Sequence, residues 1–156
     1  MKKVIYDYSL RLDQIENDKY LELSTITLDE IKRIAKGRMF IFFEPKREYI
    51  ILDTGIIDYL LQIKGVIEEI DNGNIKPFSV SCDWYSNSLE YTYDINFDVL
   101  KIREVNGNLF EIETKYKLFK KSFEKFYKKT MIELSKLYPE LSKNKNFVAI
   151  IPTKMA

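Results

Sequence analysis

The strongest constraint on this chain is a strict alternation of apolar and polar residues in its middle. From residue 89 to residue 95, every odd position holds leucine, tyrosine or isoleucine, and the even positions hold Glu90, Thr92 and Asp94. Residues 78–85 alternate in the same way, and a polar stretch separates the two runs. A period of two predicts strands with one buried face and one solvated face. Residues 78–95 are therefore expected to form a β-hairpin.

A second hairpin is expected around the Asn-Gly-Asn sequence at residues 106–108. A three-residue loop there places Ile102 opposite Ile112 and Arg103 opposite Glu111. A two-residue turn would instead place Ile102 opposite Glu111, so that apolar and charged side chains would share a face. We therefore prefer the three-residue loop, in which the buried face and the charges agree.

The first third of the chain is also expected to contribute strands. Residues 4–10 and 20–23 are interpreted as strands, and the polar residues 13–19 between them as a loop or a single turn. The runs at residues 39–43 and 49–52 are apolar on both faces, and a polar turn containing proline separates them. Such runs are typical of strands covered on both sides, so this hairpin is expected at the centre of a sheet.

Three helices are predicted. Thr27 and Glu30 match a capping box, which starts a helix that ends at Gly37. Apolar residues then share one helical face over residues 56–70. The clearest helix runs from about residue 116 to residue 137. It carries phenylalanine and leucine on one face and lysines on its other sides.

These patterns predict one α+β domain over residues 1–156, with a mostly antiparallel sheet and two to three packed helices. A chain of this length can bury a substantial core, and its 5 glycines and 4 prolines leave little room for linkers. The apolar tail at residues 147–152 is expected to add a short strand or to pack on the core.

The charges are divided unevenly along the chain. Residues 1–100 contain 12 lysines and arginines and 18 aspartates and glutamates, a net charge of −6. Residues 101–156 contain 13 lysines and arginines and 6 aspartates and glutamates, a net charge of +7. A split of this kind can steer a charged partner. The overall net charge of +1 and the pI near 7.7 argue against a dedicated nucleic-acid-binding protein.

The residue types exclude several kinds of catalytic site. The chain has no histidine, which removes histidine-dependent catalytic triads and histidine metal sites. Its glycines form no phosphate-binding cluster. Cys82, the single cysteine, lies on a predicted buried face and is expected to be a core thiol in a reducing cytoplasm. Because no bilayer-spanning run or signal peptide is recognisable, we expect a cytoplasmic protein, and we assign it no cofactor.

Two alternatives remain open for the charged residues. The carboxylates Asp83, Glu90, Asp94 and Asp98 can form an acid pair or bind a hard cation, as a metal-dependent enzyme would require. The lysine-rich helix can bind nucleic acid or an anionic membrane surface. Its aromatic residues lie opposite most of the lysines, however, so they are expected to be core residues rather than stacking platforms.

The favoured site is Tyr85 and the carboxylates around it, on the solvated side of the 78–95 hairpin. Tyrosine provides a large contact area at low entropic cost and is enriched in protein interfaces. The surrounding carboxylates suit a basic protein partner. The expected partner-binding residues, none of them catalytic or metal-binding, are Asp83, Tyr85, Glu90, Thr92, Asp94 and Asp98.

From residue 56 onward, the order of these elements resembles that of small immunity proteins of bacterial polymorphic and contact-dependent toxin systems. The resemblance covers the helix at 56–70, the Ser-Leu-Glu-Tyr return strand at 88–91, the Asn-Gly hairpin and the helix ending in Leu-Ser-Lys-Leu-Tyr-Pro-Glu-Leu at 134–141. It implies a small, cytoplasmic, non-enzymatic protein that binds and blocks one cognate toxin. Many immunity proteins against nucleases are strongly acidic and this chain is not, which favours a local acidic patch over a nucleic-acid mimic. The identity of the partner and the oligomeric state stay open.

Overall fold

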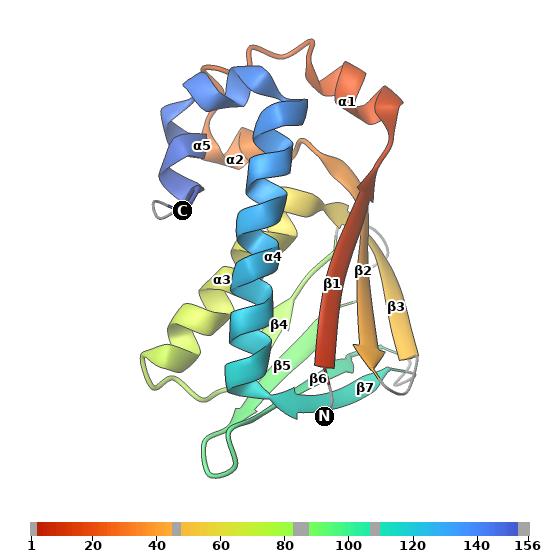
Figure 1. The fold of residues 1–156 in the computed structure, drawn as a ribbon, viewed down its shortest axis with the longest axis vertical. Helices are drawn as coiled ribbons and strands as arrows, with labels where there is room; N and C mark the ends of the chain where they lie inside the picture. Colours follow the sequence, from red (N-terminus) through yellow and green to blue (C-terminus); the bar gives the residue numbers. More distant parts are fainter. Residues whose placement is uncertain (1–2, 45–47, 83–87, 107–109, 153–156) are drawn as a thin grey trace.

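The computed structural model describes residues 3–44, 48–82, 88–106 and 110–152. Within these residues, the chain has the expected α+β class, with antiparallel strands and packed helices, but its strands form two sheets rather than the one expected. Figure 1 shows the long helix α4 (Tyr116–Leu137) along the front of the molecule. Helix α3 (Ile56–Asp71) lies on one side of α4 and the first sheet on the other, while the second sheet passes behind.

The first sheet consists of two consecutive antiparallel pairs, in the order β1–β2–β3. The strands are β1 (Lys3–Leu10), β2 (Lys36–Glu44) and β3 (Glu48–Gly55). Their inner face is buried, but the expectation that the β2–β3 hairpin is covered on both sides is wrong. Phe42, Tyr49 and Ile51 point outward and are exposed. Apolar residues on both faces favour a strand, yet α3 and α4 cover only the inner face of this sheet.

The second sheet has the order β4–β5–β6–β7. Its strands are β4 (Phe78–Val80), β5 (Leu89–Asp94), β6 (Val99–Glu104) and β7 (Glu111–Lys115). The predicted alternation is confirmed, because Leu89 and Tyr91 are fully buried. The predicted register of the second hairpin is also confirmed, since Ile102 lies opposite Ile112. Ile95 departs from the pattern, because β5 ends at Asp94 and Ile95 is exposed in the following turn. The first predicted strand is also shorter than expected, because β4 ends at Val80 and the described residues Ser81 and Cys82 lie beyond it.

Three buried tyrosines connect the two sheets and α3. The Tyr91 hydroxyl of β5 lies 2.7 Å from the Tyr6 hydroxyl of β1 and 3.3 Å from the Tyr59 hydroxyl of α3. The Tyr6 ring packs edge-on against Phe119 and Phe123 of α4. Burial raises the pKa of all three tyrosines well above the ordinary value, so their hydroxyls stay neutral inside the core.

Residues 12–23 do not form the predicted loop and strand. They form helix α1 (Leu12–Asp18) followed by turns, in which the N–H of Leu23 bonds to the carbonyl of Leu21. The side chain of Leu23 is buried, which explains its apolar character without a strand. Local turn hydrogen bonds therefore replace the strand that the apolar residues suggested.

Helix α2 (Leu28–Ile31) begins as predicted and ends early. The capping box is present, since Thr27 accepts from the N–H of Glu30 and its own N–H donates to the Glu30 carboxylate. The helix then stops after one turn at Ile31, and Ala35, four residues further on, adopts a positive φ of 54° that a longer helix could not accommodate. The buried carboxylate of Asp18 holds Ala35 by accepting its N–H over 2.9 Å. A tertiary contact thus holds the chain in a non-helical conformation at Ala35, and β2 begins at the next residue.

The C-terminal elements follow the prediction more closely. Helix α4 has the predicted bounds, and Pro139 starts the short 3₁₀ segment η1 (Pro139–Lys143). The tail packs on the core through the fully buried Phe147, but as helix α5 (Lys145–Ile150) rather than as a strand. Asn144 caps this helix by accepting the N–H groups of Asn146 and Phe147. This cap is the local signal that favours the helix.

Candidate interaction surfaces

Three of the predicted partner-binding residues lie side by side on the outer face of β5. Glu90, Thr92 and Asp94 alternate there with the inward residues, as expected. Their neighbours on β6 are basic, with Arg103 opposite Glu90 and Lys101 opposite Thr92. Strand β7 adds a second acidic row. We call this surface the second-sheet face, defined by Glu90, Thr92, Asp94, Lys101, Arg103, Glu111 and Glu113.

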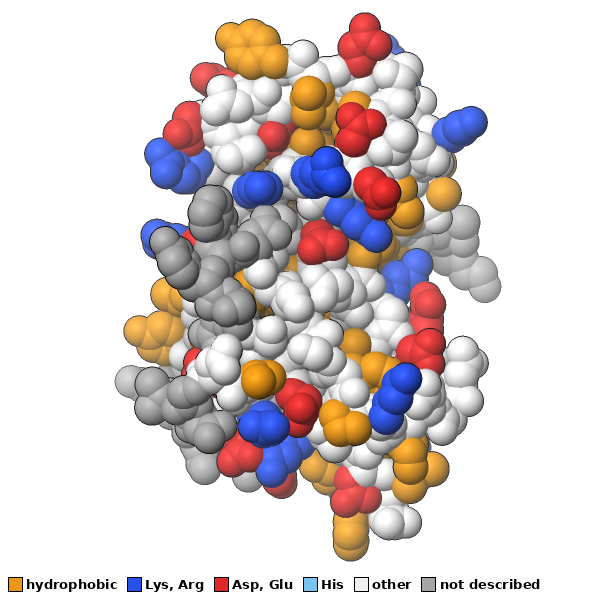
Figure 2. Space-filling view, turned by 180° about the vertical axis from the view of Figure 1, so that it is seen from behind, with side chains coloured by type: hydrophobic (Ala, Val, Ile, Leu, Met, Phe, Trp, Pro, Cys, Tyr) orange, Lys and Arg blue, Asp and Glu red, His pale blue; other side chains and the backbone are white. Residues whose placement is uncertain are grey.

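Two ion pairs join opposite charges of the second-sheet face. Arg103 Nη2 lies 3.0 Å from Glu90 Oε1, and Lys101 Nζ lies 2.8 Å from Glu111 Oε1. The hydrogen bond between Lys101 and Glu111 raises the pKa of the lysine and lowers the pKa of the glutamate. Seen from behind, acidic and basic side chains are interspersed across the visible surface (Figure 2). The predicted acidic patch therefore contains its own counter-charges.

Asp98, the other predicted residue that the structure describes, is not part of this surface. Asp98 lies in the turn before β6 with a positive φ of 52° and accepts a hydrogen bond from the Tyr93 hydroxyl over 2.9 Å. This hydrogen bond raises the pKa of Tyr93. Asp83 and Tyr85 lie outside the described residues. Cys82, expected in the core, is half-buried and packs against it.

A polar cluster that the sequence analysis missed lies beside Tyr93, whose ring is 4.9 Å from the ring of Tyr116. The Tyr116 hydroxyl donates to Asp71 Oδ1 over 2.8 Å, and Lys120 Nζ lies 2.5 Å from Asp71 Oδ2. Partial burial opposes ionisation of Asp71, but these two hydrogen bonds outweigh it and lower the pKa of the carboxyl. The partners lie 45 and 49 residues from Asp71, so no local pattern could have indicated the cluster.

A groove of about 670 Å³ runs between α3, α4 and the C-terminal residues. Ile67, Phe123 and Ile151 form part of its apolar lining, and lysines of both helices stand around it. The groove has the size of small-ligand sites. The lining of the groove includes Lys64, Lys120, Lys125, Lys128, Glu68, Asp71 and Glu124. Lysines of α4 thus do lie beside aromatic residues, although Phe123 itself is almost fully buried.

An apolar surface covers the outer side of the first sheet. Phe42, Tyr49 and Ile51 are 37%, 60% and 46% exposed. The ring centroid of Phe42 lies 6.2 Å from that of Phe40 and 6.1 Å from that of Tyr49. We call this surface the first-sheet face, defined by Ile5, Phe40, Phe42, Tyr49 and Ile51, which form two adjacent rows across the three strands.

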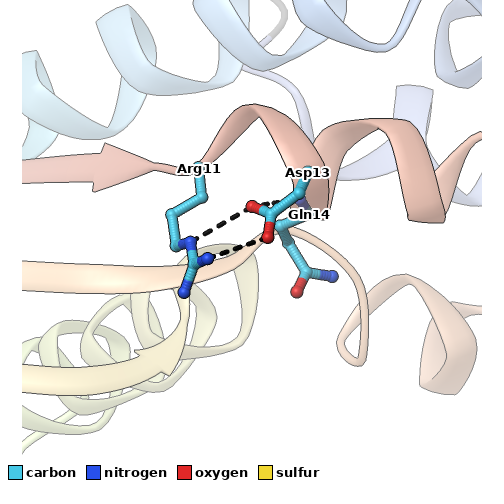
Figure 3. A network of polar contacts seen from close by, with 3 residues as sticks. All are labelled: Arg11, Asp13 and Gln14. Carbon is cyan, nitrogen blue, oxygen red and sulfur yellow. Dashed lines mark hydrogen bonds and ion pairs between the residues drawn. The ribbon is translucent and has the colours of Figure 1, made fainter.

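The first-sheet face is bordered by charged residues, most of them paired. Arg11 donates from Nε and Nη2 to the two carboxylate oxygens of Asp13 over 3.1 and 2.9 Å, and Asp13 also accepts the N–H of Gln14 (Figure 3). Arg38 Nε lies 3.5 Å from Asp53 Oδ1. A hollow of about 520 Å³ lies between these pairs. Since both guanidinium groups already face a carboxylate, this hollow offers little net positive charge to an anion.

Across residues 3–44, 48–82, 88–106 and 110–152, no three histidine, cysteine, aspartate or glutamate side chains are grouped so that they could hold a metal ion. Of the helices in these same ranges, none combines the length and the apolar character needed to cross a membrane.

Comparison with known proteins finds no matching family model, no matching curated protein and no matching solved structure.

Proposed function

We propose that this chain is a non-catalytic protein-binding module that neutralises a cognate bacterial toxin in the cytoplasm by binding it. The observation that carries the proposal is the first-sheet face. Contiguous exposed apolar side chains on a folded protein mark interaction sites more often than chance. Here Phe42 and Tyr49 are held in a regular sheet, so they can serve as rigid aromatic anchors at low entropic cost.

The surroundings of the first-sheet face favour a protein over a nucleic acid. Asp7 projects from β1 into the apolar rows, directly opposite Phe40. A carboxylate in that position repels phosphate, whereas single-strand binding surfaces place basic groups beside exposed aromatic rings. The nearby Arg38 is already paired with Asp53. An apolar centre with a border of both charge signs is the usual anatomy of a protein interface.

The order of elements adds support. Helix α3, the hairpins β4–β5 and β6–β7, and helix α4 follow one another along the chain as in the small immunity proteins that it resembles. A protein of this class needs no catalytic group, and charge around its apolar anchors mainly tunes the association rate.

The test is protection in a sensitive bacterial host. The product of the neighbouring reading frame is expressed with and without this chain, and growth is measured. We expect growth arrest without this chain and rescue with it. Phe42→Ser should abolish rescue and weaken binding to the purified toxin at least tenfold, as for the loss of an anchor. Phe97→Ser, at an exposed aromatic residue outside the first-sheet face, is the matched control and should rescue fully.

The same assay tests the second-sheet face, whose role in binding stays a prediction. The variants Glu90→Gln and Asp94→Asn remove its predicted contacts with a basic partner without altering shape. If they abolish rescue while Phe42→Ser does not, the toxin binds to the second-sheet face. If neither surface matters and the neighbouring product is harmless, the proposal fails.

A second candidate is binding of an anionic ligand in the groove between α3 and α4. The groove favours it because its apolar lining stands beside Lys64, Lys125 and Lys128. Titration with acidic lipid vesicles and with oligonucleotides at several salt concentrations tests this candidate. Affinity that does not fall with salt excludes an electrostatic mode.

A further inference from the structure

We propose that two copies of this chain associate through the free edge of β3 and form one continuous six-stranded antiparallel sheet. β3 is an outer strand, because the first sheet has the order β1–β2–β3. In the part of the chain that the structure describes, no strand pairs with its second edge. Figure 1 shows β3 at the rim of the molecule, on the side away from α4.

The opposite edge of the sheet is approached by α4 instead. Ser122 Oγ of α4 donates to the backbone carbonyl of Val4 in β1 over 3.3 Å. The Tyr8 hydroxyl of β1 donates to Glu133 of α4 over 2.9 Å. The helix therefore lies along β1, and β3 remains as the open edge. Backbone groups on an open edge can bond to an added strand.

β3 has few of the features by which edge strands usually avoid pairing, because its charged residues, Glu48 and Asp53, stand only on either side of its apolar segment. Its sequence contains neither proline nor lysine, and Tyr49, Ile50, Ile51 and Leu52 form a continuous segment of high β propensity. Tyr49 and Ile51 are exposed on the outer face of the strand, and the first charged residue after them is Asp53. A rigid, apolar and open edge is a template for another strand.

The apolar pattern of β3 complements itself in one register. Residues that lie opposite each other in an antiparallel pair point to the same face of the sheet. In a symmetric pair of two β3 strands, one residue must therefore lie opposite its own copy, and the two-fold axis passes between the two. We name each axis by that residue. With the axis at Ile50, Tyr49 faces Ile51 of the partner subunit, which is a favourable aromatic and β-branched pair. With the axis at Ile51, Tyr49 would face the carboxylate of Asp53. With the axis at Leu52, Ile51 would face Asp53. Of these three axes, the one at Ile50 is therefore the one that keeps carboxylates away from Tyr49 and Ile51 on the outer face.

This self-complementarity identifies the occupant as a second copy, since a two-fold interface uses the same patch on both subunits. One strand pair buries less area than a standard interface, so we expect a dissociation constant on the order of 10–100 μM. The association goes beyond the proposed toxin binding. It leaves Phe42 exposed and joins the two first-sheet faces into one surface.

Sedimentation equilibrium from about 1 μM to about 1 mM tests the association. The wild-type mass should rise from 18.6 kDa toward twice that value. Ile51→Lys should stay monomeric over the same range. Ile75→Lys makes the same change at a residue of similar exposure, 49% against 46%, and should dimerise like the wild type. A wild type that stays monomeric, or an Ile51→Lys variant that still dimerises, overturns the proposal. A monomeric wild type would leave the edge to a strand of another protein.

Cross-linking tests the register. The variants Tyr49→Cys and Ile51→Cys are made in a Cys82→Ala background and mixed in equal amounts. The two new cysteines should form a disulfide between subunits, because these positions face each other in the proposed register. Each variant alone should not cross-link, since its own two cysteines lie diagonally, about 7–8 Å apart. Cross-linking of Ile51→Cys alone, or none in the mixture, contradicts the axis at Ile50.

Discussion

The hydroxyl of Tyr138 donates a hydrogen bond to Oδ2 of Asp18 over 2.6 Å, across 120 residues of sequence. Asp18 is almost completely buried and also accepts the N–H of Ala35 and the side-chain amide of Gln14. One carboxylate thus joins helix α1, the turn before β2 and the end of α4. We expect it to matter more to stability than any surface ion pair.

Removing this carboxylate should destabilise the fold. Tyr138→Phe should lower the free energy of unfolding by about 1–2 kcal/mol, and Asp18→Ala by about 3 kcal/mol, because it leaves several buried donors without an acceptor. Urea denaturation measures both. The double variant should lose less than the sum, since the two residues share one interaction. Asp13→Ala breaks an exposed ion pair and should cost less than about 0.5 kcal/mol. If Asp13→Ala destabilises the fold as much as Asp18→Ala does, the buried carboxylate of Asp18 is not the more important of the two.

The buried tyrosines predict a loss of stability at alkaline pH. Tyrosine in an unfolded chain titrates near pH 10, while burial raises the pKa of Tyr6, Tyr59 and Tyr91 in the fold. The unfolded state therefore loses protons first, and stability present below about pH 10 falls as the pH rises further. Tyr91→Phe should make this fall shallower by about 1.4 kcal/mol per pH unit. Denaturation from pH 8 to pH 11 measures it, and a Tyr91→Phe slope equal to that of the wild type would contradict the prediction.

Two glycines should respond oppositely to alanine. A Cβ at Gly65 in α3 would meet nothing within 4 Å, so Gly65→Ala should stabilise the helix by about 0.5–1 kcal/mol. A Cβ at Gly37 would overlap the backbone carbonyl of Ser9 on the neighbouring strand. Gly37→Ala should therefore cost more than about 2 kcal/mol. Thermal unfolding compares the two variants directly, and a stable Gly37→Ala protein would refute the close approach of β1 and β2.

Asp71 predicts a loss of stability in acid. Its folded pKa is lowered by Lys120 and Tyr116, so its contribution is present above the ordinary aspartate pKa of about 3.9 and is lost as pH falls through the folded value. Asp71→Asn should be less stable than the wild type at pH 7 and approach it near pH 2. Denaturation curves at both pH values provide the measurement. Lys120→Met should reduce the same pH dependence. If it does not, the hydrogen bond from Tyr116 alone lowers the pKa of Asp71.

The sequence predicts those parts of the fold whose signals are local. The bounds of α4 follow from a long apolar stripe, and the pairing of Ile102 with Ile112 follows from faces and charges that agree in one register. The same reasoning finds the outward row of Glu90, Thr92 and Asp94.

Long-range contacts account for what could not be predicted. The predicted helix could not continue to Gly37, because Asp18 binds Ala35 in a non-helical conformation, and the residues after Thr27 contain no local signal of that contact. The exposure of Tyr49 and Ile51 depends on which face of the sheet α3 and α4 cover. Because these strands are apolar on both faces, their sequence does not indicate which face the helices cover. Asp71 meets Tyr116 only in the folded chain.

The position of α4 has a consequence for synthesis. Both sheets are meanders of consecutive strands, so each can pair as soon as its own segment has left the ribosome. The inner face of β1, however, packs on Phe119 and Phe123, which are made more than a hundred residues later. At typical translation rates, that interval is on the order of ten seconds. During this time the nascent chain carries an unfinished core, and we expect chaperones to bind it until residue 137 has emerged.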